Sequence, residues 1–236
     1  MRLGLLLLVL FVFQCQELKN LEPLINQTSK KRGLTESEII SGLKEALNVG
    51  AEQASKSCSN TDGFWKNELI RIAIPPELKK VKENLDKIGL SKQVSDFEMK
   101  MNRAAEQASG KAFPIFKDAV LSMSFSDARG ILTGSDSSAT LYFRQKTYQK
   151  LYDEFNPVVD AAMKKIQLVN LYENLITKYN KIPFVEKVEF DLDRYICEKT
   201  LDGLFLTLKN EEKGIRKEPL KRINTILKKV FDKNNW

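Results

Sequence analysis

Apolar side chains recur at spacings of three and four residues along most of this chain, a pattern typical of amphipathic helices. Ile39, Leu43 and Leu47 follow it, and small side chains at fourfold spacing from Ala46 to Ala54 would let a second helix approach closely. The pattern predicts helices over Thr35–Cys58, Pro76–Ile88, Ser91–Met123, Ser126–Leu132, Ser137–Phe155, Pro157–Tyr179, Asp191–Lys213 and Pro219–Phe231.

Local signals mark several helix boundaries. Thr35 stands three residues before Glu38, which is the spacing of a capping box at a helix start. Asn156 before Pro157 predicts a new helix with proline at its first position. Pro114 falls inside the predicted helix over Ser91–Met123 and is expected to kink it.

Two short segments alternate apolar and polar residues instead. They are LIRIAIPP, Leu69 to Pro76, and VEKVEF, Val185 to Phe190. A period of two is the pattern of a strand, and prolines close the first segment. The sequence therefore predicts an all-α, multi-helix single domain with at most one small two-stranded sheet, formed by these segments.

The first residues predict export. Arg2 precedes an apolar run from Leu3 to Phe13, which is too short to span a bilayer at about 20 residues but matches the hydrophobic region of a signal peptide. Cys15 is the one small side chain near its end, so VFQC resembles the lipidation site of bacterial lipoproteins. Phe13 and Gln14 depart from that site, where small residues are usual.

This interpretation divides the chain into a signal peptide at 1–14, a lipidated Cys15 with a flexible tether at 15–34, and a helical domain at 35–236. The tether would hold the domain roughly 25 Å from a membrane of the bacterial cell envelope. Secretion with another cleavage, or none, and a merely apolar N-terminus are the alternatives. In an oxidising compartment, Cys58 and Cys197 either pair or remain buried as small hydrophobic side chains.

The composition narrows the possible chemistry. The chain contains no histidine, which excludes serine or cysteine nucleophiles activated by histidine and metal sites of the HExxH type. Catalysis would have to use carboxylates, lysine, tyrosine or a serine–lysine pair. We expect no cofactor and no metal, and the composition favours a protein without catalytic activity over an enzyme.

A polar group interrupts the small residues of the segment MNRAAEQA. Asn102 and Glu106 fall on the flank of the apolar stripe, and Arg103 lies three residues before Glu106. The group is either an ordinary surface ion pair or a polar cluster that lines a cleft.

The polar loop GILTGSDSSATLYFR leads into another helix. Its glycines and serines lack the pattern of a phosphate-binding loop and are expected to end one helix at Leu132 and cap the next near Ser135 or Ser137. On the helical wheel Arg144 falls within the apolar stripe, with Thr140 on its edge. A buried arginine needs a partner, either a carboxylate of the protein or an anionic ligand at the helix start.

Basic charge gathers near the C-terminus. From Lys213 to Lys233 there are eight basic and two acidic residues, and the predicted helix from Pro219 has one apolar stripe. This segment either packs on the domain with a solvated basic face or binds anionic lipid. No base-reading motif occurs, so we expect no nucleic acid as a partner, and a protein partner is not defined.

Several segments together resemble the bacterial family catalogued as domain of unknown function 4197. They are GLKEALNVGAEQA with the DGF that follows, IRIAIPPEL, MNRAAEQA, SDARGILTG with ATLYFR, and EEKGIRKEP with the closing KKVF. The resemblance spans about Ile39 to Phe231 and implies an exported, mainly helical protein without an assigned activity. It singles out Asn102, Arg103, Glu106, Asp127, Gly134, Thr140, Arg144, Glu212 and Arg216.

Three functions remain open from the sequence. The first is a non-catalytic binding or structural lipoprotein of the envelope. The second is a binder of a small anionic ligand, or an enzyme that uses carboxylates, in a cleft around Arg144, Asn102 and Glu106 or Asp127. The third is a peripheral membrane protein that acts through the basic C-terminal helix.

Overall fold

The computed structural model describes residues 35–218 and Lys228, and every regular element in this part of the chain is a helix. The predicted signal peptide, the tether and the C-terminal helix over 219–231 lie outside the described residues. The predicted all-α fold class is confirmed. The elements are α3 (Glu36–Ser59), the 3-10 turn η2 (Pro76–Leu78), α4 (Lys79–Lys87), α5 (Ser91–Ser109), α6 (Ala112–Leu121), α7 (Phe125–Thr133), α8 (Ser138–Lys165), α9 (Leu168–Asn180) and α10 (Leu192–Lys217).

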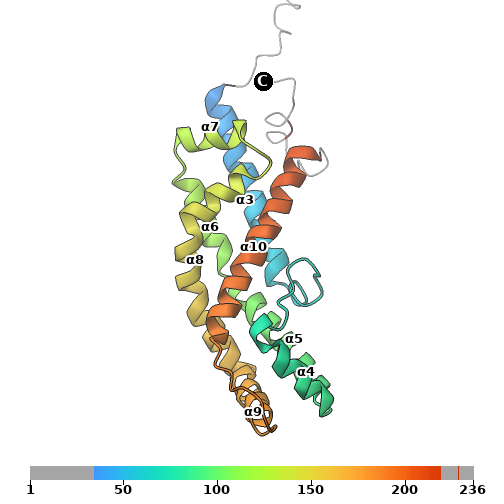
Figure 1. Cartoon of the computed structure of the whole chain (residues 1–236). Helices are drawn as coiled ribbons and strands as arrows, with labels where there is room; N and C mark the ends of the chain where they lie inside the picture. The colour runs from blue at the N-terminus through green and yellow to red at the C-terminus, as the bar shows by residue number, and fades with distance from the viewer. Residues whose placement is uncertain (1–34, 219–227, 229–236) are drawn as a thin grey trace, which may run out of the picture.

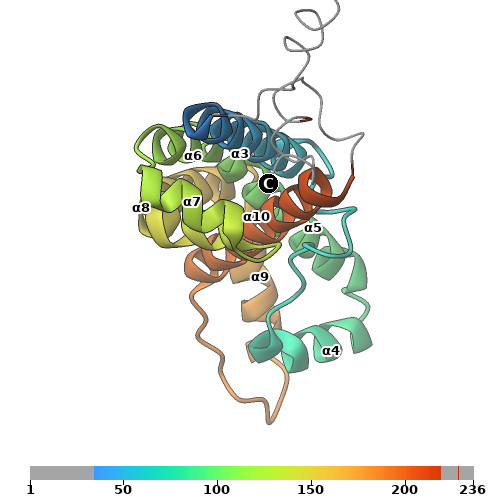
Figure 2. The same cartoon turned by 90° about the horizontal axis from the view of Figure 1, so that it is seen from above.

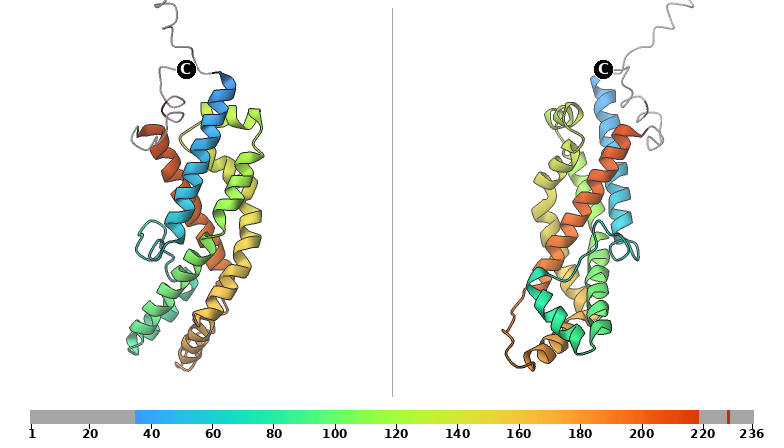
Figure 3. Two further views of the ribbon diagram at one scale, coloured as in Figure 1. Left: turned by 180° about the vertical axis from the view of Figure 1, so that it is seen from behind. Right: turned by 45° about the vertical axis from the view of Figure 1, so that its right-hand side comes forward.

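The long helices run lengthwise and form an elongated bundle (Figure 1). Helix α10 packs against α8, α3 and α5, and α5 also packs against α8. Seen along the bundle, α4 lies to one side of the long helices (Figure 2). Helix α7 lies at the end where α3 begins and α10 ends, whereas α4 and α9 lie at the opposite end (Figure 3). The two ends of the continuous described segment, Thr35 and Glu218, are therefore at the same end of the molecule.

Aromatic side chains fill the centre of the bundle. The ring of Phe116 meets those of Phe143 and Phe205 edge-on, with centroids 5.1 and 5.9 Å apart, an arrangement that favours close packing of π-systems. The small residues of α3 allow α10 to approach as predicted, because a Cβ on Gly50 would already touch Ile215 at 3.4 Å. The core therefore joins helices from both halves of the sequence.

The capping box predicted at the start of the first helix is confirmed. Thr35 and Glu38 form a full capping box at the start of α3, and α3 ends at Ser59, one residue beyond the predicted end. A second capping box joins Ser124 and Asp127 at the start of α7. The hydrogen bonds from Ser124 lower the pKa of the Asp127 carboxyl, so this residue serves the helix end.

Two proline predictions need correction. The segment over 91–123 is two helices, because Pro114 has no N–H to give to the carbonyl of Gly110, and α6 instead starts at Ala112 with this proline in its first turn. Pro157 does not start a helix but lies inside α8. The helix continues through it because Phe155 and Val159 are both fully buried, and their packing outweighs the lost hydrogen bond. Helix α8 ends instead before Gln167, which adopts a left-handed backbone with φ 58°.

The predicted two-stranded sheet is absent from the described residues. Residues 71–75 and 185–190 form no strand. The alternating pattern of the first segment has another cause: Ile70 and Ile72 are buried and Arg71 is exposed because one side of the segment packs on the helices. Its backbone at Ile72 pairs with the side chain of Asn102 instead of with a second strand.

Candidate functional site

Glu106 is a carboxylate of α5 that is only 4% exposed. Its Oε1 accepts hydrogen bonds from the backbone N–H groups of Phe64 (3.2 Å) and Trp65 (3.3 Å). Its Oε2 accepts one from Arg103 at 2.7 Å. A buried charge is tolerated when it is paired and hydrogen-bonded in this way. The predicted Arg103–Glu106 pair is confirmed, but Glu106 is buried and therefore not part of an ordinary surface pair.

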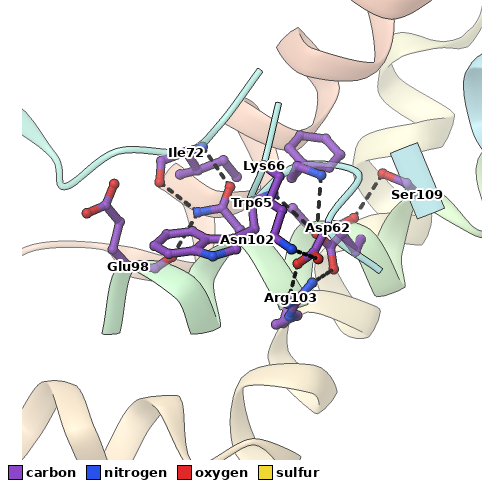
Figure 4. A network of polar contacts seen from close by, with 11 residues as sticks. Asp62, Trp65, Lys66, Ile72, Glu98, Asn102, Arg103 and Ser109 are labelled. Carbon is purple, nitrogen blue, oxygen red and sulfur yellow. Dashed lines mark hydrogen bonds and ion pairs between the residues drawn. The ribbon is translucent and has the colours of Figure 1, made fainter. Parts of the chain in front are cut away.

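Arg103 links Glu106 to the loop that follows α3. Its second nitrogen donates to Asp62 at 2.6 Å, and Lys66 binds the other oxygen of Asp62 at 2.8 Å. The hydrogen bond from Lys66, followed by that from Arg103, lowers the pKa of the Asp62 carboxyl. Gly63 is required in this turn, because a Cβ there would lie 2.3 Å from the carbonyl oxygen of Ser57. Figure 4 shows Asp62, Lys66 and Arg103 meeting beside α5.

Asn102 holds the next part of the same segment. Its Oδ1 accepts the N–H of Ile72 (2.8 Å), and its Nδ2 donates to the C=O of Ile72 (2.9 Å) and to that of Glu98 (2.8 Å). The amide is fully buried and replaces a neighbouring strand by binding both polar groups of one residue (Figure 4). We call Asp62, Asn102, Arg103 and Glu106 the anchor cluster, because together they fix residues 62–72 to α5.

The opposite side of this segment rests on α10. A Cβ on Gly203 would lie 2.7 Å from the ring of Phe64 and 3.1 Å from Ile70. Phe64 itself is fully buried. The segment is therefore held between two helices. Glu106 and Asn102 of the anchor cluster bond to the protein's own backbone.

A second buried carboxylate caps helix α8. Glu212 of α10 accepts the N–H groups of Ala139 and Thr140, both at 2.9 Å, and the hydroxyl of Thr140 at 2.8 Å. Two amides at a helix start are a favourable site for negative charge. The Glu212 carboxylate therefore caps α8, because the side chain of Ser137, the N-cap residue, makes no capping hydrogen bond.

Arg216 completes this second group. It binds Glu212 at 3.0 Å and donates to the C=O of Ile131 at 2.8 Å, which connects the end of α10 to α7. A cavity beside Glu212 has a volume of only about 20 Å³, room for one water molecule at most. Thr140, Glu212 and Arg216 therefore join three helices.

Arg144 has a carboxylate of the protein as its partner, which was one of the two predicted alternatives, but its predicted burial is wrong. Its side chain is 48% exposed and pairs with Asp202 of α10 at 3.4 Å, with its guanidinium 5.3 and 5.4 Å from the rings of Tyr148 and Phe205. The buried stripe of α8 instead contains Phe143, Thr147, Leu151 and Phe155. The buried face of this helix is therefore not the predicted one that includes Arg144. Asn102 and Glu106 bind residues 64–72, and no hydrogen bond or ion pair joins them to Arg144 within residues 35–218.

A groove runs along α10 beside residues 69–73, with a volume of about 300 Å³. One wall is the segment held by the anchor cluster, and the other is a stripe of α10. Arg71, on the first wall, stacks over Trp65 at 3.8 Å and binds Glu98 at 3.0 Å. The residues that line the groove are Leu69, Ile70, Arg71, Ile72, Ala73, Tyr195, Lys199, Asp202, Gly203 and Leu206.

Sequence reasoning missed this groove. Tyr195, Lys199, Asp202 and Leu206 recur at helical spacing along α10, which is a weak signal because any helix face gives it. The partner wall lies about 120 positions earlier in the chain, as the 122-residue separation of Tyr195 and Ala73 shows. Only the fold brings the two together.

The described residues contain no group of three or more cysteine, aspartate or glutamate side chains arranged to hold a metal ion. None of their helices combines the length and apolar character needed to cross a membrane. Cys58 and Cys197 are both buried and unpaired. Burial raises the pKa of the Cys58 thiol to about 11 and that of Cys197 to about 12, so both thiols are protonated near neutral pH.

The sequence model of a family described as a protein of unknown function, DUF4197, matches residues 33–232. The chain belongs to the DUF4197 family. No curated protein and no solved structure matches it. The family match spans all the described helices of this DUF4197 protein, including both buried carboxylate groups.

Proposed function

We propose that this DUF4197 protein is a non-catalytic binding or structural lipoprotein of the bacterial cell envelope. The observation that carries the proposal is the use of its buried polar residues. Glu106 and Glu212 each bind two backbone N–H groups and one arginine. Such residues stabilise a scaffold, whereas a catalytic carboxylate must reach a substrate.

The proposed attachment to a membrane rests on the N-terminal sequence. Cys15 follows the apolar run that ends at Phe13, and α3 begins at Glu36. Twenty intervening residues of flexible chain would span roughly 25 Å. Several acyl chains on one cysteine are enough for stable anchoring, because a single chain gives only reversible binding.

Replacement of Cys15 by serine is expected to release the protein from the membrane fraction. Wild-type protein should sediment with membranes, and mass spectrometry should find a mature N-terminus at Cys15 that carries acyl chains. The Cys15→Ser chain should be soluble after export. Cys58→Ser is the matched control, because its buried thiol is not available for acylation. A wild-type chain that begins at Met1 or carries no lipid would contradict the anchor.

A second candidate function, peripheral binding to anionic lipid, is favoured by one feature of the fold. The start of α3 and the end of α10 lie at the same end of the bundle (Figure 1). The tether and the basic C-terminal sequence therefore both leave the described domain at the end that would face the membrane. Basic residues near an anionic surface contribute about 1 kcal/mol each.

Removal of residues 219–236 is expected to weaken vesicle binding of the Cys15→Ser chain. The deletion removes five basic residues and one acidic residue. With vesicles of phosphatidylcholine containing phosphatidylglycerol, we expect a loss of affinity of at least about tenfold, and added salt should weaken the intact chain in the same way. Vesicles of phosphatidylcholine alone serve as the control. Equal binding of both chains to the anionic vesicles would exclude this function.

A further inference from the structure

The backbone of residues 71–73 presents unpaired polar groups to the groove. Ile72 gives its N–H and its C=O to Asn102 of α5. The peptide bonds of the described residues are all trans, and in a trans peptide the C=O and N–H point in opposite directions. The C=O of Arg71 and the N–H of Ala73 therefore point away from α5. The C=O of Ala73 accepts a hydrogen bond from Tyr195 of α10 at 3.1 Å, which places α10 on that side.

Neither the C=O of Arg71 nor the N–H of Ala73 has a hydrogen-bond partner among residues 35–218. These two groups flank one residue. In a parallel sheet, one residue of the adjoining strand donates its N–H to the first such group and accepts from the second. An extended peptide in the groove would thus add a strand to this edge, which is a recurrent mode of peptide recognition.

The edge is held in place before any peptide binds. Asn102 fixes Ile72 on one side, and the close approach of Gly203 to Phe64 and Ile70 fixes the preceding residues on the other. A rigid site loses little conformational entropy on binding, and this favours affinity. The anchor cluster therefore does more than stabilise the fold. It determines that the C=O of Arg71 and the N–H of Ala73 face away from α5.

The charges of the groove favour an acidic peptide. Asp202 is shared between Arg144 at 3.4 Å and Lys199 at 3.7 Å, so two cations face one carboxylate. Arg71 is already balanced by Glu98. Arg144 reaches Asp202 from α8, so the cluster of Arg144, Lys199 and Asp202 carries one net positive charge beside the groove. Leu69, which is 71% exposed, and Leu206 provide apolar contacts for neighbouring side chains.

We propose that this groove binds an extended, acidic peptide segment of a partner protein. The peptide backbone bonds to the C=O of Arg71 and the N–H of Ala73, and a carboxylate of the peptide lies beside Lys199. The inference rests on the proposed non-catalytic binding function and specifies its ligand. The peptide class follows from the unpaired backbone edge, and the acidic character follows from the cations around Asp202.

The test uses the full chain, purified in detergent, and fluorescent hexapeptide pools in which one position is fixed and the others are varied. Pools fixed as Asp or Glu are expected to bind most tightly by fluorescence polarisation. Lys199→Glu should weaken their binding by about tenfold, since like charges then face each other. The matched control is Lys209→Glu, an exposed lysine of the same helix outside the groove, which should bind within about twofold of wild type. Both variants should keep the wild-type circular dichroism spectrum.

The backbone contact has its own measurement. A single peptide from the best pool should lose at least about tenfold in affinity when the N–H of its central residue is methylated, and it should shift the amide resonance of Ala73. Absence of binding, or equal binding by the wild-type and Lys199→Glu chains, overturns the proposal. Mass spectrometry of the recovered peptide tests the peptide site and the non-catalytic function separately. Cleaved peptide would refute the non-catalytic function while the site stands, and intact peptide supports both.

Discussion

Replacing Glu106 with alanine is expected to lower the free energy of unfolding by about 3–5 kcal/mol. The change leaves the N–H groups of Phe64 and Trp65 without their acceptor and removes one of the two carboxylates that bind Arg103. A domain of this size is stable by about 5–15 kcal/mol, so the expected loss is a large fraction of the total stability. Urea denaturation followed by circular dichroism measures the loss.

Two companion variants show whether the backbone contacts cause this loss. Glu106→Gln keeps an oxygen acceptor for the two amides but removes the charge, so a smaller loss of about 1–3 kcal/mol is expected. Gln107→Ala changes an exposed neighbour on the same helix and should change stability by less than about 0.5 kcal/mol. A loss below about 1 kcal/mol for Glu106→Ala would mean that residues 62–72 are held without this carboxylate.

Replacing Glu212 with alanine is expected to lower the free energy of unfolding by about 2–4 kcal/mol. The variant uncaps the N–H groups of Ala139 and Thr140 at the start of α8 and removes a carboxylate that binds Arg216. Because Arg216 also reaches the carbonyl of Ile131, the junction of α7, α8 and α10 should loosen. Urea denaturation gives the size of the loss, and hydrogen exchange of the Ala139 and Thr140 amides gives its location.

A matched carboxylate on the same helix provides the control. Glu198 binds Arg194 on the surface and is 41% exposed, so Glu198→Ala should cost less than about 1 kcal/mol. Unchanged exchange of the Ala139 and Thr140 amides in Glu212→Ala would refute the capping role. A local increase in exchange at the start of α8, with α3 unaffected, is the expected pattern.

The two buried carboxylates give the polar residues of MNRAAEQA and EEKGIRKEP a structural role in this chain. Asn102, Glu106 and Glu212 replace backbone partners that regular secondary structure would otherwise supply. Residues 62–72 lack a neighbouring strand, and the first turn of α8 lacks a side-chain bond from its own N-cap residue. Such a polar motif indicates a backbone segment whose N–H and C=O groups need side-chain partners. Once residues 62–72 are held in this way, they form one wall of the groove beside α10.

The sequence by itself determined the helical class and the start of α3. That start depends on a contact within four residues, Thr35 with Glu38, and such a contact follows from spacing alone. The apolar periodicity located most helices for the same reason. The predicted pair of Arg103 and Glu106, one helical turn apart, also belongs to this local group.

Only the tertiary structure decided which polar residues are buried and what they bind. Asn102 meets Ile72 across 30 residues of chain, and Glu212 meets Thr140 across 72, so spacing could not reveal either pair. Packing also decided that α8 continues through Pro157, and it set the face of that helix that leaves Arg144 exposed beside Asp202. Local rules set each helix alone, whereas burial depends on the neighbours that the fold assembles.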